Sequence, residues 1–329
     1  MATTATMKAA IYQRTGPARE VLRVTEVERP DPAPGEVRVR VTESGVNPTD
    51  VKSRQGLTPQ VIDGFQIPHQ DGSGEIDAVG DGVDPARIGQ RVWVWLAAAG
   101  RRWGTAAEWT VVPEHQAVPL PDNASFELGA SLGVPAMTAY HCLFVDGSLD
   151  GRTVLVAGGA GAVGHFAIEL AKRDGARVVT TVSGPEKGEL AKRAGADRVV
   201  NYREADAVEQ ISSFAPQVDR IVEVALDQNL RMDLAVSGYG TTIVTYAAPA
   251  QDPPLPVRAC MTANVVLRFV LLYGVPVPAL IAAAGAITLA LGDGTLTELP
   301  VQRFTLDQIV EAHEAVEAGV NGKVLVDIA

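Results

Sequence analysis

A glycine-rich run in the middle of the chain has the spacing of a phosphate-binding turn. The segment Thr153–Ala157 is apolar and β-branched, and Gly159, Gly161 and Gly164 follow it in a G-x-G-x-x-G pattern. A strand before such a pattern and a helix after it distinguish a dinucleotide-binding turn from a chance match. The first glycine permits the tight turn, the second lets the backbone approach a pyrophosphate, and the third lets the helix pack closely. Because N–H groups at the start of the helix face the phosphates, we expect contacts from Gly159, Gly161, Ala162, Val163 and Gly164.

The end of the next strand indicates which dinucleotide binds. An NAD enzyme usually places Asp or Glu there to bind the ribose 2′-hydroxyl, whereas this chain has Val182-Ser183-Gly184. Ser183 can donate a hydrogen bond to the extra phosphate of NADPH, and Lys187 can supply positive charge. Glu186 lies close to this strand end in sequence, so NADH remains the alternative. We predict NADPH as the cofactor.

Strands and helices alternate on both sides of this turn, which predicts βαβ units and a doubly wound parallel sheet of the Rossmann type. We expect strands at Thr153–Ala157, Arg177–Val182, Arg198–Asn201, Arg220–Val224 and Thr241–Tyr246. We expect helices at Val163–Asp174, Glu186–Ala194 and Glu204–Ser213, preceded by helices at Phe126–Val134 and Ala136–Val145 that Pro135 separates.

The first hundred or so residues are rich in short β-branched runs separated by Pro and Gly, which is typical of a mostly antiparallel β domain. The last thirty or so residues return to this character, with a helix at Thr305–Glu317 and a strand at Lys323–Ile328. We therefore predict an α/β protein of two domains: 1–125 together with 296–329, and the dinucleotide-binding domain 126–295.

The composition is that of a globular enzyme, with 47% hydrophobic and 20% charged residues among 329. A net charge of −11 would repel phosphate backbones and anionic lipids, so we expect neither nucleic acid nor membrane partners. Cys142 and Cys260 are too few for a disulfide framework and are expected to be buried thiols. The start of the chain, Met1–Met7, lacks the pattern of a signal peptide, so we expect a cytoplasmic protein.

A stretch from Phe269 to Gly292 contains no charged residue and is long enough to span a bilayer. Gly274, Pro276 and Pro278 interrupt it, however. We interpret it as a buried strand near Ala263–Tyr273 followed by an apolar helix.

Several further segments resemble the medium-chain dehydrogenase/reductase superfamily, and within it the quinone oxidoreductase (zeta-crystallin-like) branch. The resemblance covers nearly the whole chain and includes the glycine-rich turn. Its other segments are Gly45-Val-Asn-Pro-Thr-Asp50, Ile67-Pro68 before Gly72-Ser-Gly74, Gly133-Val-Pro-Ala-Met-Thr-Ala-Tyr140 and Gly322-Lys-Val-Leu-Val326. The resemblance implies that the β domain has the GroES-like fold.

Zinc-dependent members of this superfamily hold the catalytic metal with Cys, His and Cys. The matching positions here are Asn47, Gln70 and about Val134, with His69 one place before Gln70 where those enzymes have Gly. We therefore predict no metal site. Without a Lewis acid an alcohol is hard to oxidise, whereas hydride transfer to a quinone or an α,β-unsaturated carbonyl remains feasible. This favours a reductase.

The resemblance also implies roles for single residues. Asn47 lies beside the nicotinamide in that branch, with Asp50 nearby either orienting the site or capping a helix. Tyr140 is a candidate proton donor. The resemblance places the adenosine 2′-phosphate at Lys187 and Tyr202, and the rest of the cofactor near Thr138, Asn229, Tyr246, Ala247 and Lys323.

We predict an NADPH-dependent reductase acting on a small quinone, by direct hydride transfer. Two alternatives remain open: an enone, enoyl or alkenal reductase, and a crystallin-like protein that binds NADPH with little turnover. The segments Gln55-Gly56-Leu57 and Ala97–Trp103 depart from the branch, so the resemblance says least about the substrate. A homodimer is expected, because the family commonly pairs an edge strand such as Val265–Tyr273 across a dimer.

Overall fold

The computed structural model describes residues 5–249 and 251–328 of the chain. It divides into two compact units, Met1–Val134 with Glu298–Ala329, and Pro135–Thr297. The first boundary falls inside the helix α3 (Phe126–Phe144). The prediction of two helices broken at Pro135 is therefore wrong. Pro135 lies inside a continuous helix, and its missing N–H removes one hydrogen bond without ending the helix.

The second unit contains a six-stranded, fully parallel sheet with the strand order β10-β9-β8-β11-β12-β13. The order reverses between β8 and β11, and ligands bind at such switch points in doubly wound folds. This confirms the predicted Rossmann-type sheet. The strands are β8 (Thr153–Ala157), β9 (Arg177–Val182), β10 (Arg198–Asn201), β11 (Val218–Glu223), β12 (Ser237–Thr245) and β13 (Val266–Phe269).

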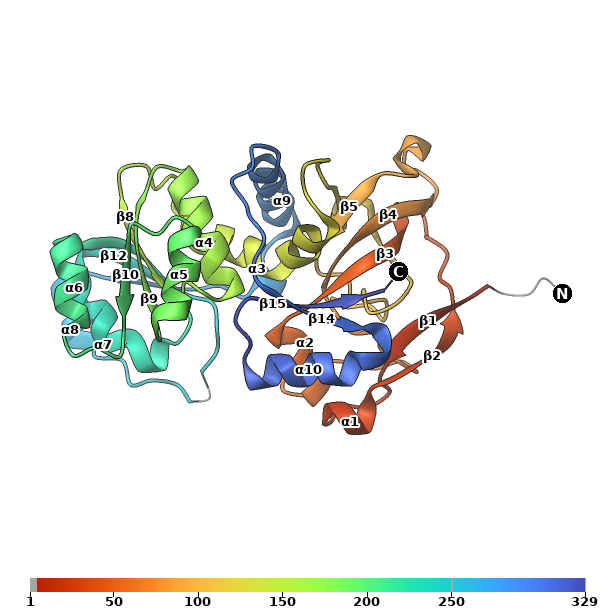
Figure 1. The fold of residues 1–329 in the computed structure, drawn as a ribbon, viewed down its shortest axis with the longest axis horizontal. Helices are drawn as coiled ribbons and strands as arrows, with labels where there is room; N and C mark the ends of the chain where they lie inside the picture. The colour runs from red at the N-terminus through yellow and green to blue at the C-terminus, as the bar shows by residue number, and fades with distance from the viewer. Residues whose placement is uncertain (1–4, 250, 329) are drawn as a thin grey trace. The chain divides into compact units, whose positions relative to one another are not determined.

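Helices cover both faces of this sheet, with α4 and α5 on one face and α6, α7 and α8 on the other (Figure 1). Apolar residues of the strands and of α6 and α7, such as Leu155, Ile211 and Leu230, form one buried cluster. The sequence interpretation did not identify α7 or α8, and it extended α6 too far toward the N-terminus. The helices are α4 (Ala162–Arg173), α5 (Pro185–Arg193), α6 (Ala207–Phe214), α7 (Leu226–Val236), α8 (Val257–Ala263) and α9 (Val277–Gly292), with a short 3-10 helix η3 (Leu272–Gly274).

The strand predicted to be buried near Ala263–Tyr273 is the short β13 at the edge of the sheet, and the side chain of Phe269 is 74% exposed. The apolar residues on either side of Arg268 suggested a core strand, but only one edge of β13 is paired within the described residues. Cys142 is buried as expected, whereas Cys260 in α8 is only half-buried. In the part of the chain that the structure describes, no helix is long and apolar enough to cross a membrane.

The first unit is built on a mostly antiparallel sheet with the order β14-β15-β3-β4-β5-β7, and β6 pairs with β3. The C-terminal strand β15 inserts between β14 and β3, so the end of the chain completes the N-terminal domain. A separate hairpin joins β1 and β2. The strands are β1 (Thr6–Ile11), β2 (Arg23–Glu28), β3 (Glu36–Val46), β4 (Asp71–Val79), β5 (Arg91–Val94), β6 (Trp109–Pro113), β7 (Ala117–Pro119), β14 (Val301–Thr305) and β15 (Lys323–Asp327).

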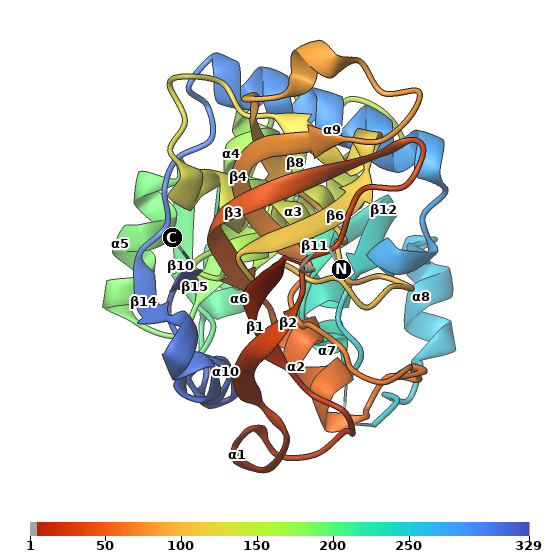
Figure 2. The ribbon, with the colours of Figure 1, turned by 90° about the vertical axis from the view of Figure 1, so that its right-hand side faces the viewer.

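Short helices cover one end of this sheet. The helix α10 (Ile309–Ala318) packs against α2 (Pro48–Gln55), α1 (Ala18–Val21) and β15, and Figure 2 shows α1, α2 and α10 close together. Buried Ile11, Ile67, Ile309 and Val324 tie these elements into one core. The remaining elements are the 3-10 helices η1 (Pro85–Arg87), η2 (Glu114–Gln116) and η4 (Leu306–Gln308).

Candidate functional site

The glycine-rich turn joins β8 to α4, and its three glycines are required for different physical reasons. A Cβ atom on Gly159 would lie 2.1 Å from Oγ1 of Thr180, and one on Gly164 would lie 2.3 Å from the carbonyl oxygen of Gly158. Both must be glycine for the chain to pack. A Cβ atom on Gly161 would meet only the oxygen of Gly158, at an ordinary 3.5 Å.

No internal contact therefore requires Gly161, and its φ of −79° suits any residue. The residue is also the N-cap of α4, and no side chain caps the helix there. Unpaired N–H groups at such a helix start carry partial positive charge and bind phosphate. The turn thus fits a pyrophosphate: two glycines shape the backbone, and the third keeps the approach to Ala162 and Val163 open.

The predicted 2′-phosphate residues lie together at the ends of two neighbouring strands. Asn201 pairs with Val182, and the backbone N–H of Tyr202 donates to the oxygen of Val182 over 3.1 Å. Tyr202 therefore lies beside Ser183, at the start of α5 where Lys187 follows. The Tyr202 ring is half-exposed, and the guanidinium of Arg203 lies 5.9 Å from its centre. The arrangement offers hydroxyl and cationic donors at the strand end.

In the first unit, three polar residues meet at one end of three adjacent strands. The pairing of Val324 with Val46 and of Gly45 with Asp71 brings the start of β15, the end of β3 and the start of β4 together. Lys323, Asn47 and Asp71 occupy these positions, and each is at most 2% exposed. Strand register alone accounts for their proximity.

These three side chains form a closed hydrogen-bonded triangle. Nδ2 of Asn47 donates to Oδ2 of Asp71 over 2.7 Å, and Nζ of Lys323 donates to Oδ1 of Asn47 over 2.7 Å. Lys323 also pairs with Oδ2 of Asp71 at 3.1 Å. The other carboxylate oxygen, Oδ1, accepts the backbone N–H of Val134 over 2.7 Å. Every oxygen of the buried carboxylate thus has a donor, as a buried charge requires.

Asp50 stands next to this triangle on α2 and caps that helix. Asn47 and Asp50 form a capping box, in which the carboxyl oxygen Oδ2 of Asp50 accepts the N–H of Asn47 over 2.8 Å. The capping role, left open by the sequence, is therefore present. Burial, reinforced by the nearby Asp71 charge, raises the pKa of Asp50 to about 8. The group is mostly protonated at neutral pH, and its Oδ1 has no hydrogen-bond partner among the described residues.

The positions that match zinc ligands have other partners. The side chain of Asn47 belongs to the triangle, and Val134 supplies a backbone N–H to it. Oε1 of Gln70 accepts the N–H of Ala98 over 3.2 Å and so supports the loop after β5. The described residues 5–249 and 251–328 contain no group of three or more His, Cys, Asp or Glu that could hold a metal ion.

The remaining predicted site residues lie in the second unit. Thr138 and Tyr140 are on α3, and the Tyr140 ring packs 4.9 Å from that of Phe144. Tyr246 and Ala247 follow β12, and burial raises the pKa of Tyr246. Asn229 lies on α7, where its amide donates to both oxygens of Glu223, at 3.0 and 3.2 Å. Their contact with a cofactor stays a prediction.

Sequence reasoning missed two buried carboxyl groups. Asp71 connects the other two residues of the triangle. The sequence did offer a sign of its importance, because Asp71 directly follows Gln70, which matches a metal-ligand position. Glu223 ends β11 and accepts hydrogen bonds from the backbone N–H of Ala225 and from the side-chain amide of Asn229. Burial and the Glu223 charge raise the pKa of Asp233 to about 9, so Asp233 carries the proton of this pair.

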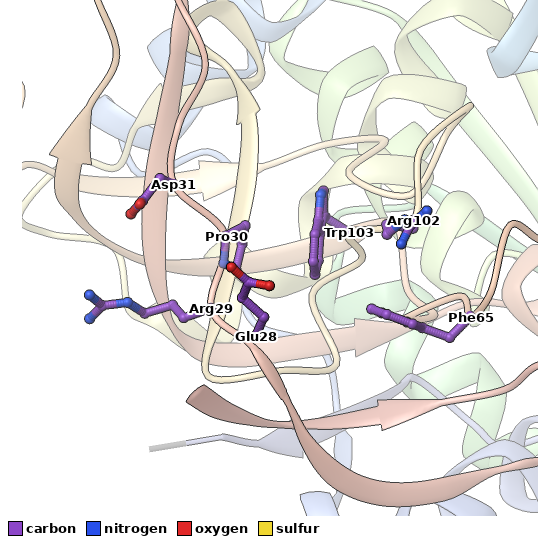
Figure 3. Close-up of a pocket in the computed structure, with 7 residues that line it drawn as sticks. All are labelled: Glu28, Arg29, Pro30, Asp31, Phe65, Arg102 and Trp103. Carbon is purple, nitrogen blue, oxygen red and sulfur yellow. The ribbon is translucent and has the colours of Figure 1, made fainter. Parts of the chain in front are cut away.

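A separate hollow of about 370 Å³ opens on the first unit between β2 and the loop before β6 (Figure 3). Trp103 and Phe65 form one wall, with Arg102 over the Phe65 ring at 5.2 Å and paired with Asp63 at 2.7 Å. Asp31 pairs with Arg38. Arg102 and Asp31, which line this hollow, therefore each have an oppositely charged partner.

Comparison with known proteins gives matches along the whole chain. Residues 33–122 match the alcohol dehydrogenase GroES-like domain, and residues 162–285 match the zinc-binding dehydrogenase domain. Human quinone oxidoreductase is 27% identical over 321 residues, covering 96% of this chain and 95% of that protein. An alcohol dehydrogenase of Geobacillus stearothermophilus is 33% identical over 276 residues, covering 76% of this chain and 80% of that one.

Solved structures agree with these matches. A mycobacterial quinone oxidoreductase superposes with a TM-score of 0.84 at 28% identity, covering 98% of this chain and 99% of that one. A mycobacterial protein solved in complex with NADPH superposes with the same TM-score at 27% identity, over 98% of this chain and 99% of that one.

Proposed function

Because the chain belongs to the medium-chain dehydrogenase/reductase superfamily, in its quinone oxidoreductase branch, we propose that this oxidoreductase transfers hydride from NADPH to a quinone without zinc. Members of the superfamily bind NAD(P), and the β8–α4 turn has the shape that a dinucleotide requires. NADPH rather than NADH is supported by Ser183, Lys187 and Tyr202 at the strand ends, where no carboxylate stands on the end of β9.

The Asn47–Asp71–Lys323 triangle is the observation that carries the proposal for zinc-independent chemistry. A metal would need thiolate, imidazole or carboxylate ligands around an open position. The matching positions instead supply an amide, a backbone N–H and a glutamine that supports a loop. Lys323 provides a fixed positive charge in this region, held by two hydrogen bonds.

In the proposed hydride transfer, the cofactor and the protein have separate roles. Bound NADPH supplies the hydride, and the protein positions the reactants and excludes water. Asn47 and Lys323 set the position and charge of the polar cluster. Asp50 holds a proton at neutral pH because its pKa is raised to about 8. We propose that Asn47 faces the nicotinamide, with Asp50 and Tyr140 as the groups through which a proton reaches the reduced product.

The acceptor is tested by measuring NADPH absorbance loss with 1,4-benzoquinone and with an alkenal, with NADH in parallel. The proposal expects faster turnover with the quinone and with NADPH. Preference for the alkenal would assign enone reduction instead. Tight NADPH binding without turnover of either acceptor would contradict the reductase proposal and favour a binding role.

We also propose that the protein forms a homodimer through the edge strand β13. Among the described residues, the outer edge of β13 has no neighbouring strand. The exposed Phe269 and Leu271 lie in a segment without charged residues from Phe269 to Gly292. An open, apolar edge is a template for pairing with a second strand. Light scattering should give twice the chain mass for the native protein and the chain mass for Phe269→Lys. A native monomer would contradict this part of the proposal.

A further inference from the structure

Four buried side chains in the first unit form a continuous line of hydrogen bonds that ends at Asp71. Nε2 of His313 lies 3.1 Å from Nε2 of His69, and Nδ1 of His69 lies 2.8 Å from Oγ of Ser44. The Ser44 hydroxyl lies 2.7 Å from Oγ1 of Thr105, which donates to the backbone oxygen of Asp71. All four side chains have 0% exposure, so no water competes for these bonds.

The line has only one consistent arrangement of protons when both rings are neutral. Thr105 uses its hydroxyl proton on the oxygen of Asp71, so Ser44 must donate to Thr105. Ser44 has then used its own proton and must accept one from Nδ1 of His69. Nε2 of His69 is consequently bare and accepts from Nε2 of His313. The tautomers are thereby fixed as Nδ1–H on His69 and Nε2–H on His313.

Burial, reinforced by the charges that face the two rings, keeps them neutral. His69 is faced by Lys323 on β15 and by His313 on α10, and burial together with these groups lowers its pKa well below the ordinary value. His313 is faced by Arg54 on α2, and burial with that charge lowers its pKa to about 3. Both neighbouring ions are cations, so neither ring gains a proton at neutral pH.

His69 also has an unusual backbone conformation. Its φ is 77°, in the left-handed region that non-glycine residues rarely adopt. The residue stands two positions before Asp71, and Thr105 binds both residues: its N–H donates to the oxygen of His69 over 3.2 Å and its hydroxyl to the oxygen of Asp71. Strained residues persist where surrounding contacts hold them, and they cluster near functional sites.

We propose that His69 and His313 are positioning residues, which fix Asp71 through Ser44 and Thr105 and so set the placement of Asn47 and Lys323. The inference rests on the proposed function for its kinetic consequences, because the triangle is the part of the site that replaces a metal. His313 contributes from α10 through its hydrogen bond to His69. The direction of the hydrogen bonds, and not a change in the charge of either histidine, fixes the position of Asp71.

Matched variants separate the effect of the N–H donor of His313 from the effect of its side-chain volume. His313→Gln keeps an N–H at the place of Nε2, whereas His313→Leu has similar volume and no donor. His69→Asn keeps a donor toward Ser44 and tolerates a left-handed φ, whereas His69→Ala has neither property. We expect the Leu and Ala variants to lose kcat on the order of tenfold, with the KM for NADPH unchanged. The Gln and Asn variants should retain most of kcat.

A spectroscopic measurement tests the same inference without turnover. Imidazole ¹⁵N shifts of the full-length protein should report Nδ1–H on His69 and Nε2–H on His313, and these shifts should not change between about pH 6 and pH 8. The amide resonance of Val134, which donates to Asp71, should move in His313→Leu and stay in place in His313→Gln.

Finding the opposite tautomers would overturn the positioning role. It would also be overturned if His313→Leu changed neither the Val134 amide resonance nor kcat. A native protein that turns over no acceptor but shows these tautomers and these amide shifts would contradict the proposed function alone. The two failures are therefore distinguishable.

Discussion

The ammonium nitrogen of Lys323 lies 3.1 Å from Oδ2 of Asp71, and the two residues are 2% and 0% exposed. This ion pair joins the C-terminal strand β15 to the start of β4, so the end of the chain contributes directly to the candidate site. Asn47 bridges the two charges and Val134 completes the shell around the carboxylate. A buried charge with a full set of partners is stable only while each partner remains.

Removing Lys323 should therefore destabilise the protein strongly. Lys323→Met leaves the Asp71 carboxylate buried without its cation, and loss of one partner of a buried pair costs about 3–5 kcal/mol. The double variant Lys323→Met with Asp71→Asn removes both charges and should recover part of that loss. Urea unfolding measures both effects. Equal stability of Lys323→Met and the native protein would contradict the structure of the triangle.

Gly161→Ala should weaken dinucleotide binding without loss of stability. The added Cβ meets only an ordinary contact at 3.5 Å within the protein, but it fills the approach to the helix N-terminus. We expect the Kd for NADPH to rise roughly tenfold or more, about 1.4 kcal/mol, while the unfolding midpoint stays the same. Fluorescence titration and urea unfolding measure the two quantities.

Gly164→Ala is the matched control for that variant. Its Cβ would lie 2.3 Å from the oxygen of Gly158, so this substitution should lower stability as well as binding. If Gly161→Ala binds NADPH as tightly as the native protein, the turn does not hold the pyrophosphate.

Lys187→Ala should reduce the preference for NADPH. Loss of one cation beside a phosphate removes a charge-assisted hydrogen bond of about 1.5–3 kcal/mol, so the KM for NADPH should rise at least tenfold and the KM for NADH should not change. Lys192→Ala, on the same helix and paired with Glu189 at 2.7 Å, serves as the control. An unchanged NADPH-to-NADH ratio in Lys187→Ala would contradict the proposed cofactor.

Much of the fold could be predicted from the sequence, because hydrophobic periodicity and glycine spacing are local signals. The strands β8, β9 and β10 have the predicted bounds, and the glycine-rich turn joins a strand to a helix as expected. The continuous helix α3 was missed because tertiary packing overrides the local effect of Pro135. The segment of β13 was expected to be buried and also to form a sheet edge. It does lie at the edge, but its residues are exposed or half-buried, and sequence alone does not show how far a strand is covered.

The candidate site was less accessible to sequence reasoning. Asn47, Asp50 and Lys323 were named from the family resemblance, but their connection through Asp71 depends on the register of β3, β4 and β15. The link from His313 to Thr105 spans elements that are far apart along the chain. Long-range pairing of this kind follows from the packed fold and leaves no periodic pattern.

Buried carboxyl groups should make the protein less stable as the pH rises. Burial raises the pKa of Asp50 to about 8 and that of Asp233 to about 9, from an ordinary 3.8. The folded state therefore keeps protons that the unfolded state releases, and the free energy of unfolding falls between pH 3.8 and these values. The slope is up to about 1.4 kcal/mol per pH unit for each group.

Asp233→Asn isolates the contribution of one of these groups. Asparagine has nearly the same shape as protonated aspartic acid but does not titrate, so the loss of stability between about pH 6 and pH 9 should be smaller than in the native protein. Urea unfolding at both pH values measures the difference. The same loss in both proteins would show that Asp233 does not hold the proton.

Metal dependence tests the central claim most directly. The measurement is kcat/KM for NADPH oxidation by 1,4-benzoquinone before and after exhaustive treatment with a chelator, with zinc content determined in both samples. The proposal predicts equal kcat/KM values and less than stoichiometric zinc throughout. Loss of turnover on chelation, with recovery on adding zinc, would contradict a site organised by Asn47, Asp71 and Lys323 in place of a metal.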